Sequence, residues 1–235
     1  PPITDDFFEK PYPKKLPHFN YYFEEFLTNW GQELMKKEYG VKIVRPNARY
    51  EINKYGVDLD SIESLFNDPL TKQVPGVIFG FVPGIFLGLK EYYEKHMSVP
   101  ELHPDTMIIS FGGWSAPDRN KIPPEFFREK VSSFLNINKK NIRDVYCFTE
   151  TDPIFAECEC HNKNMPPWVD IIVRDVKTLE PIKAGETGLT NIINPMAYSY
   201  AGVSMLQDDV VKIEDIDGCP CGREGKVLKV YGPAN

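Results

Sequence analysis

The chain has 235 residues, of which 42% are apolar and 26% charged, and its formal net charge is −7. This is the composition of a globular protein large enough to bury a core, as one large domain or as one domain plus a small one. An acidic balance without a long basic run argues against a nucleic-acid partner, and no apolar run approaches the roughly 18–20 residues of a membrane span. The proline-rich, acidic N-terminus lacks the pattern of a signal peptide, so we expect a cytoplasmic protein.

The N-terminal part of the chain predicts an extended arm followed by a helix and a strand. Residues 1–20 are rich in proline, and residues 21–39 carry apolar side chains at the spacing of an amphipathic helix. Gly40 ends that helix, and residues 41–44 form a short strand. We interpret the aromatic stripe of the helix as core rather than as a ligand site. Because the chain begins with Pro1 and no Met, we also expect residues to be missing at one or both ends, or internally.

Helix and strand patterns alternate between residues 58 and 150. The apolar spacing predicts a helix, a strand, a helix, a strand, a helix and a strand, over residues 58–66, 75–81, 85–93, 107–111, 124–135 and 142–150. The strand over 75–81 is apolar on both sides, as expected where both faces of a sheet are covered. The alternation predicts an α/β fold with a largely parallel sheet and helices on both faces.

After residue 165 the pattern changes to short strands separated by turns. We predict strands over residues 168–175, 188–193, 210–213 and 227–231, with a turn-rich connection over 177–186. This spacing is typical of a small antiparallel β subdomain. The chain would then divide into an N-terminal arm and helix (1–45), an α/β core (46–165) and the small β subdomain (166–235).

Glycine or polar residues stand at the ends of two predicted strands. Gly112 and Gly113 follow one of them, and Thr149 and Glu150 end another. Ligands bind at the carboxyl ends of strands in open α/β sheets, and two glycines let a backbone approach a flat ligand. Hydroxyl and carboxylate oxygens are the ligands that phosphate-bound Mg²⁺ prefers. The competing interpretations are a plain turn at the glycines and a helix N-cap at Thr149.

Four of the five cysteines form two Cys-x-Cys pairs, Cys158 with Cys160 and Cys219 with Cys221. In a cytosolic chain such pairs indicate metal binding more than disulfides, and together they can present four thiolates to one tetrahedral Zn²⁺. His161 is an alternative to one member of the first pair. Four protein ligands leave no open position, so the zinc would be structural. The competing interpretation is four reduced cysteines in a β subdomain.

Five motifs stand in the order seen in adenylate-forming enzymes. They are Gly112-Gly113-Trp114, residues 146–150 (Tyr-Cys-Phe-Thr-Glu), residues 185–189 (Gly-Glu-Thr-Gly-Leu), Asp208-Asp209 and residues 219–223 (Cys-Pro-Cys-Gly-Arg). The chain resembles the phenylacetate–CoA ligase branch, and most closely the acyl-protein synthetase subunit of bacterial fatty-acid reductases, the complex that feeds aldehyde to bacterial luciferase. The glycine turn, the stretch over 166–169 and the strand end at 174–175 particularly suggest that subfamily. The resemblance covers residues 75–233.

The resemblance implies an enzyme that joins a carboxylate to the α-phosphorus of ATP, releases pyrophosphate and passes the acyl group to a thiol. Residues 112–114 would then lie against the adenine, and Tyr146 would stack near it. Thr149 and Glu150 would face the α-phosphate and Mg²⁺. Asp209 would hold the ribose hydroxyls, because a carboxylate can accept two hydrogen bonds from a cis-diol. A solvated acid at a strand end is the competing interpretation of Asp209.

Other family features have no counterpart in this stretch of sequence. The Ser/Thr/Gly-rich loop that wraps the β- and γ-phosphates does not occur in residues 1–75, and the hinge Gly-Arg reads Gly232-Pro233. The C-terminal lid with its catalytic lysine, and the acyl-accepting cysteine, would lie beyond Asn235. Cys147 replaces the glycine that usually follows the motif tyrosine, and we interpret it as a small buried residue rather than as a nucleophile. The chain is therefore either a trimmed enzyme or a divergent member that binds without turnover.

The function we expect first is ATP-dependent activation of a fatty or aryl carboxylate and its transfer to a protein thiol. An apolar pocket drawn from residues 79–86 and 111–114 would hold the carboxylic acid. One alternative is a nucleotide-binding or interaction module without turnover, which the missing phosphate loop favours. Another is an acyl-CoA ligase, which differs only in the acceptor thiol. An acyl-CoA reductase subunit as partner follows from the resemblance alone.

Overall fold

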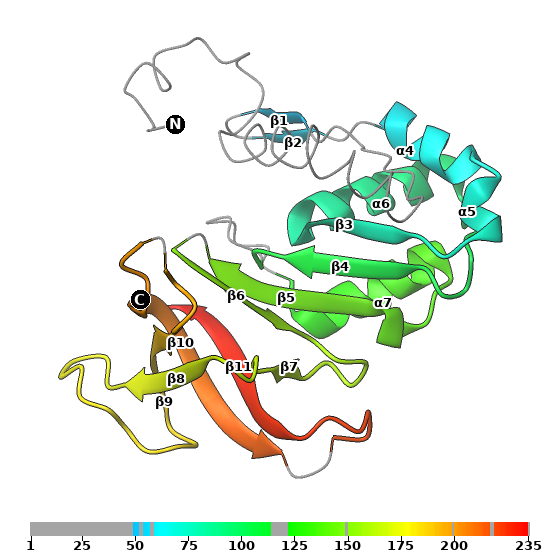
Figure 1. The fold of residues 1–235 in the computed structure, drawn as a ribbon. Coiled ribbons are helices and arrows are strands. Elements are labelled where there is room, and N and C mark those ends of the chain that lie inside the picture. The colour runs from blue at the N-terminus through cyan, green and yellow to red at the C-terminus, as the bar shows by residue number, and fades with distance from the viewer. Residues whose placement is uncertain are drawn as a thin grey trace. The chain divides into compact units, whose positions relative to one another are not determined.

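The computed structural model describes residues 49–51, 54–56, 59–113, 122–148, 150–198, 200–216 and 219–234 (Figure 1). The predicted arm, the helix over 21–39 and the strand over 41–44 lie outside these residues, as do Trp114 and Thr149. The chain divides into two compact units. One consists of residues 1–74, 83–102 and 134–136, and the other of residues 75–82, 103–133 and 137–235.

The described part of the first unit is mainly helical. It contains a short antiparallel pair of strands, β1 (Arg49–Glu51) and β2 (Lys54–Gly56), and the helices α4 (Leu59–Asn67), α5 (Leu70–Gln73) and α6 (Val82–His96). The helix predicted over 58–66 is confirmed, and the one predicted over 85–93 extends further at both ends. Proline is tolerated in the first turn of a helix, so Pro83 does not delay the start of α6.

Aromatic contacts and one ion cluster hold these helices. The rings of Phe66 and Tyr92 meet edge to face at 4.8 Å, which packs α4 on α6. On the exposed side, Glu63 Oε1 accepts hydrogen bonds from Lys95 Nζ at 2.6 Å and from His96 Nε2 at 2.9 Å. Each link joins the same two helices.

The second unit contains the predicted, largely parallel sheet. Its strands are β3 (Val77–Phe81), β4 (Met107–Phe111), β5 (Ile142–Phe148) and β6 (Thr151–Ala156), in the order β3-β4-β5-β6 (Figure 1). The first three are parallel, which confirms the α/β class, and β6 is antiparallel to β5. The strand predicted over 142–150 was wrong at its end, because the chain turns back after Phe148. The sequence did not predict β6, because Pro153 argues against a strand. Proline is tolerated there because β6 is at the edge of the sheet.

The helix α7 (Pro124–Leu135) has the bounds that the sequence predicts. It starts with a proline and buries Phe127, Val131 and Leu135, which lie on one face at helical spacing. A 3₁₀ turn over Lys139–Asn141 leads into β5. Among the described residues, no helix is long and apolar enough to cross a membrane.

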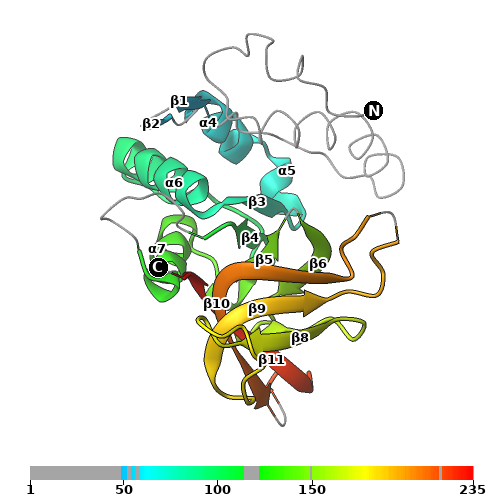
Figure 2. The same ribbon diagram turned by 90° about the vertical axis from the view of Figure 1, so that its left-hand side faces the viewer.

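The second unit also contains an antiparallel sheet, which confirms the predicted β subdomain. Its strands are β7 (Lys163–Asn164), β8 (Asp170–Arg174), β9 (Thr187–Ile193), β10 (Ser204–Ile216) and β11 (Gly225–Pro233), in the order β7-β11-β10-β9-β8. Figure 2 shows the four longer strands, β8 to β11. The sequence predicted only the apolar centre of β10, residues 210–213, because residues 207–209 are polar and interrupt the alternation. It missed the two-residue strand β7.

One hydrophobic cluster connects the two sheets of the second unit. Phe155 of β6 is fully buried in one cluster with Val169, which precedes β8, and with side chains of the antiparallel sheet, which are Ile171, Val173, Ile192, Val211, Ile213 and Leu228. Tyr146 and Phe148 of β5 pack against this cluster. The β5–β6 hairpin is therefore attached to the antiparallel sheet by apolar packing, and residues of both sheets can form one site.

Candidate functional site

A hydrogen bond connects Tyr146 and Asp209, two of the residues that the resemblance assigns to the nucleoside. The Tyr146 hydroxyl donates to Asp209 Oδ2 at 2.8 Å, across 63 positions of sequence. The ring of Tyr146 meets that of Phe148 edge to face at 4.8 Å. Burial raises the pKa of Tyr146 far above its ordinary value of 10.0, and the hydrogen bond to Asp209 adds to the effect. Tyr146 is therefore a neutral donor across the physiological pH range.

Asp209 owes its position to a bulge in β10. Leu206 pairs with Asn191 and Val210 pairs with Leu189, so residues 207–209 all face Thr190 of β9. The Thr190 hydroxyl donates to the carbonyl oxygen of Asp209 at 2.9 Å, which satisfies a backbone group that the bulge removes from the ladder. Bulges redirect side chains and occur often beside active sites. Here the bulge brings Asp209 to Tyr146.

The glycine turn follows β4 directly. Gly112 and Gly113 have φ angles of +74° and +57°, which is the left-handed region that other residues avoid. A Cβ atom on Gly112 would come within 2.8 Å of Phe81 Cδ1, whereas one on Gly113 would meet nothing within 4 Å. The absent side chain at Gly112 leaves room for the Phe81 ring.

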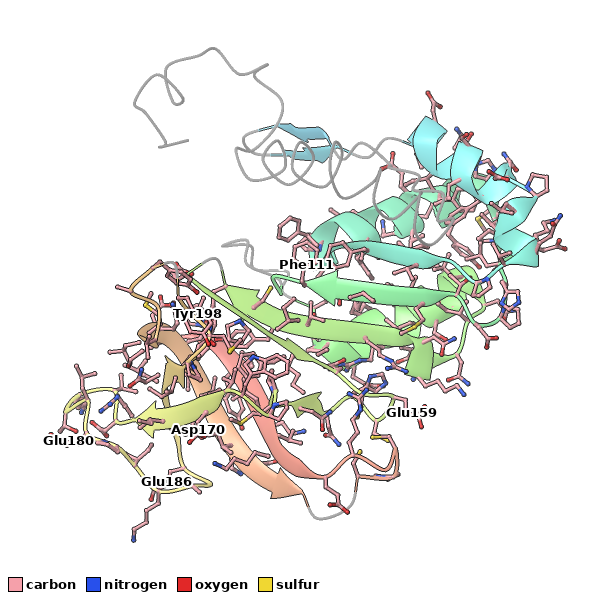
Figure 3. The ribbon with its side chains drawn as sticks, viewed as in Figure 1. Phe111, Glu159, Asp170, Glu180, Glu186 and Tyr198 are labelled. Carbon is pink, nitrogen blue, oxygen red and sulfur yellow. The ribbon has the colours of Figure 1, made fainter. Side chains whose placement is uncertain are left out.

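Three phenylalanines stack beside this turn. The ring of Phe111, which ends β4 in Figure 3, lies 4.7 Å from that of Phe79 and 4.2 Å from that of Phe81. Phe111 is buried, while Phe79 is 49% exposed. The carboxyl ends of β3 and β4 thus present a partly exposed aromatic surface.

Glu150 lies in the tight turn between β5 and β6, where Phe148 pairs with Thr151. Its side chain is exposed at the carboxyl end of β5, the strand next to β4 in the sheet. The structure therefore brings Tyr146 and Asp209 into contact, and it puts the glycine turn and Glu150 at the carboxyl ends of neighbouring strands. Trp114 and Thr149 were predicted for the same site but lie outside the described residues.

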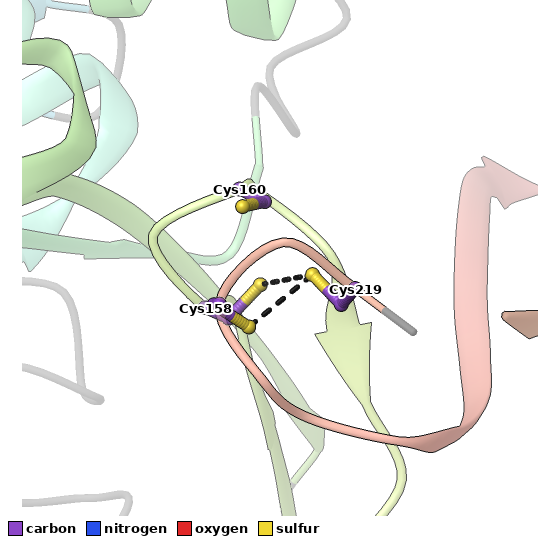
Figure 4. A group of neighbouring side chains, drawn as sticks. Cys158, Cys160 and Cys219 are labelled. Atoms are coloured by element: carbon purple, nitrogen blue, oxygen red, sulfur yellow. Dashed lines mark hydrogen bonds between the residues drawn. The ribbon is translucent and has the colours of Figure 1, made fainter. Parts of the chain in front are cut away.

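Four cysteine sulfurs form a second candidate site. The Sγ atoms of Cys158, Cys160, Cys219 and Cys221 all lie within 4.8 Å of one another, and Cys158 and Cys219 are buried. Cys158 Sγ is 3.8 Å and Cys221 Sγ is 3.2 Å from Cys219 Sγ. Four thiolates about 2.3 Å from a tetrahedral zinc lie about 3.8 Å apart, so the spacing fits this metal. Figure 4 shows the turn that carries Cys158 and Cys160 facing the turn that carries Cys219.

The local hydrogen bonds favour a thiolate at Cys219. The backbone N–H and the thiol of Cys221 donate to its sulfur, as does Asn162 Nδ2 at 3.4 Å, and these bonds lower the pKa of Cys219 to about 6. His161, the alternative ligand, has its Nδ1 3.5 Å from Glu157 Oε2. Cys147 is apart from the cluster and exposed, so its predicted burial was wrong.

A buried charge network adjoins the cysteines, and the sequence did not predict it. Glu157 accepts hydrogen bonds from Arg128 Nη2 at 2.7 Å, Lys163 Nζ at 2.8 Å and the backbone N–H of Asp144 at 2.9 Å. Lys163 also pairs with Asp144 at 2.8 Å. Burial by itself would raise the pKa of Glu157, but the two cations and these hydrogen bonds outweigh it, and the pKa falls below 4.5. Glu157 thus ties α7, β5 and β7 together next to Cys158.

Comparisons with known proteins find relatives of this chain in one family. The family described as Acyl-protein synthetase, LuxE, matches residues 38–235. The chain is 28% identical over 136 residues to a long-chain-fatty-acid–luciferin-component ligase of Aliivibrio fischeri, covering 57% of this chain and 36% of that protein. It is 30% identical over 126 residues to the Vibrio harveyi protein of the same name, covering 53% and 33%. The chain thus spans about a third of the length of these relatives.

A solved structure of 2-hydroxyisobutyryl-CoA ligase, in complex with 2-HIB-AMP and CoA, has the same fold. It superimposes with a TM-score of 0.55 at 16% identity, covering 74% of this chain and 39% of that one. The family match spans most of the chain and includes every described residue of both candidate sites. The resemblance drawn from the motifs is therefore confirmed, and the chain belongs to the acyl-protein synthetase (LuxE) family.

Proposed function

We propose that this chain is part of an enzyme that activates a fatty or aryl carboxylate with ATP and transfers the acyl group to a protein thiol. A carboxylate oxygen attacks the α-phosphorus, and the bond to pyrophosphate breaks. The acceptor thiolate then attacks the acyl carbon of the acyl-adenylate, and AMP leaves. The observation that carries the proposal is the contact of Tyr146 with Asp209, in a chain of this family.

That contact supports a nucleoside site, because adenine and ribose are neighbours in one molecule and need neighbouring recognition groups. The Tyr146 ring offers a face to the purine. Asp209 offers a carboxylate that can accept hydrogen bonds from both ribose hydroxyls. Residues 112–114 would flank the adenine, and the backbone could approach it closely at Gly113, where an added Cβ atom would meet nothing within 4 Å.

Glu150 and Thr149 are the groups we assign to the α-phosphate and Mg²⁺. The donor type fits, since Glu150 presents an exposed carboxylate at the carboxyl end of β5. Bound Mg²⁺ would offset the negative charge of the phosphates. Glu150 would hold the ion beside the nucleotide that Tyr146 orients from the same hairpin.

The aromatic surface of Phe79, Phe81 and Phe111 supports an apolar carboxylic acid as substrate. The three rings stack at the ends of two strands, next to the glycine turn, and Phe79 is half exposed. The two relatives compared above are named for long-chain fatty acids. We therefore assign a fatty acid to this protein in preference to an aryl acid.

The four cysteines are the groups we assign to a structural Zn²⁺. They come from two connections that are far apart in sequence, so one ion would fasten the turn after β6 to the turn after β10. Four thiolates would complete the coordination of zinc and leave no position for substrate. The zinc would therefore stabilise the fold and take no part in the reaction.

The proposed partner is an acyl-CoA reductase subunit, as the family resemblance implies. A cytoplasmic location belongs to the same proposal, because all five cysteines are free thiols and thiols stay reduced in that compartment.

The decisive experiment is carboxylate-dependent ATP–pyrophosphate exchange by the full-length natural polypeptide, with acids from acetate to myristate. We expect exchange with long-chain acids, followed by transfer of labelled acyl groups to protein rather than to CoA. ATP binding without exchange for any acid would overturn the proposal in favour of a non-catalytic nucleotide-binding module. Preferential transfer to CoA would identify an acyl-CoA ligase instead.

A further inference from the structure

Asn194 is a buried residue whose side-chain nitrogen and oxygen and backbone N–H and carbonyl each make a hydrogen bond. It follows β9, and its side chain is 1% exposed. Its Nδ2 donates to Thr151 Oγ1 at 3.3 Å, and its Oδ1 accepts from the backbone N–H of Met196 at 3.1 Å. Its own N–H donates to the carbonyl of Val203 at 2.8 Å, and its carbonyl accepts from Ala197 at 3.3 Å. Asn194 thus makes hydrogen bonds within the β9–β10 connection and also bonds this connection to β6.

Thr151 accepts the hydrogen bond from the Asn194 side chain. It is 2% exposed, begins β6 and directly follows Glu150. A buried hydroxyl without a partner is costly, so the bond from Asn194 holds this hydroxyl in one place. The turn that carries Glu150 is consequently fixed at its outgoing side to the end of β9.

A second bond fixes the same hairpin on its incoming side. Tyr146 of β5 donates to Asp209 of β10, so the turn lies between two anchors on the antiparallel sheet. The Tyr146 anchor involves a residue assigned to the nucleotide. The Thr151 anchor does not, since both of its side chains are buried and belong to neither candidate site. Its position indicates that it serves the turn rather than the ligand.

We propose that Asn194, through Thr151, is a positioning residue that holds Glu150 where it binds the metal–nucleotide complex. This rests on the proposed function, in which Glu150 binds Mg²⁺ with ATP. A metal ligand must be held within about 0.5 Å of its working geometry by the residues around it. Loss of the anchor should therefore raise the Mg²⁺ concentration needed for activity, in addition to any effect on stability.

The test uses the full-length protein and four variants. Thr151→Val removes the acceptor with little change of shape, and Thr151→Ser retains it. Asn194→Ala removes the donor. The matched control is Asn191→Ala, since Asn191 is equally buried in β9 but bonds Arg174 Nε and Ser204 Oγ, away from the hairpin. The Mg²⁺ dependence of ATP–pyrophosphate exchange and the amide hydrogen exchange of Glu150 and Thr151 are measured for each.

We expect Thr151→Val and Asn194→Ala to need about fivefold more Mg²⁺ for half-maximal exchange, the factor that corresponds to one lost hydrogen bond. Both should show faster amide exchange at the turn, while Thr151→Ser and Asn191→Ala behave as wild type. If Asn194→Ala does not fold, the Mg²⁺ requirement and amide exchange of Thr151→Val alone test the proposal.

Three results would overturn the proposal, and the first two are distinguishable from the third. If Thr151→Val exchanges at the wild-type rate with an unchanged Mg²⁺ requirement, the role of Asn194 is refuted but the proposed function stands. The same conclusion follows if the Mg²⁺ requirement of Asn191→Ala rises as much as that of Thr151→Val. A wild-type protein without exchange for any acid would refute the proposed function and, with it, a role of Asn194 in the reaction. The amide exchange data then show whether the turn is anchored as described.

Discussion

The hydroxyl of Tyr146 lies 2.8 Å from the carboxylate of Asp209, and this bond joins β5 of the parallel sheet to β10 of the antiparallel sheet. The bond restricts both side chains before any ligand arrives. A carboxylate held by a tyrosine is oriented for its next hydrogen-bond partners, which reduces the entropy lost on binding.

Replacement of Tyr146 by Phe should weaken ATP binding about fivefold and lower the unfolding free energy by about 1 kcal/mol, the usual contribution of one hydrogen bond. The ring and its packing against Phe148 remain. Titration calorimetry with ATP and urea unfolding measure the two effects. The control is Tyr198→Phe, because Tyr198 is 83% exposed (Figure 3). Equal behaviour of the two variants would contradict a specific role for the Tyr146 hydroxyl.

Replacement of Glu150 by Gln should reduce ATP–pyrophosphate exchange by about a hundredfold or more, the scale of losing one electrostatic contact to the reacting group. The side chain is exposed, so the melting temperature should stay within a degree or two of wild type. Glu180→Gln, at the exposed position labelled in Figure 3, is the control for a change of one surface charge. Full activity in Glu150→Gln would refute the assignment.

Protein purified without chelator should contain about one equivalent of zinc, because metal affinity and folding are coupled when thiolates converge. Cys219→Ser should lose that zinc and unfold at lower temperature, whereas Cys147→Ser should keep it, since Cys147 stands apart from the cluster. Elemental analysis of the three proteins gives the answer. Less than about a tenth of an equivalent in the wild type would be incompatible with the proposed site.

Replacement of Glu157 by Gln should lower the unfolding free energy at pH 7 by about 3 kcal/mol, because Arg128 and Lys163 would lose their buried counter-ion. The folded-state pKa of Glu157 is below the ordinary 4.5, so its contribution is complete above pH 4.5 and is lost as the pH falls through the folded value. The difference between variant and wild type should therefore shrink in acid.

Denaturant unfolding at several pH values measures this difference. Glu159→Gln is the matched control, since Glu159 is exposed two residues away (Figure 3) and should change stability by no more than about 0.5 kcal/mol. A difference for Glu157→Gln that stays constant down to pH 3 would exclude the proposed ion network as its cause.

Replacement of Gly112 by Ala should destabilise the protein more than replacement of Gly113 by Ala. Both positions have positive φ angles, which cost a side chain about 1–2 kcal/mol. Only at Gly112 would the added Cβ also meet the Phe81 ring, at 2.8 Å. Thermal unfolding of the two variants compares them directly. The reverse order would show that the stack of Phe81 on Phe111 does not limit the space at this turn.

The sequence by itself determined the elements whose pattern is local. Residues 107–111 and 124–135 were predicted with the bounds that β4 and α7 have, because an unbroken apolar run and a helical repeat need no distant partner to be recognised. The order of short motifs along the chain also determined the family, since residue types and spacing are sequence properties.

Only the tertiary structure decided which of these residues meet. The contact of Tyr146 with Asp209 depends on a bulge in β10. The three polar residues of that bulge interrupt the apolar pattern, so the sequence predicted only part of the strand. In the sequence Glu157 and Asn194 are ordinary polar residues, and only the fold buries them and brings them the Arg128 guanidinium of α7 and the Thr151 hydroxyl of β6. These pairings span 29, 43 and 63 positions of sequence and depend on strand register and on packing between elements, which no local pattern encodes.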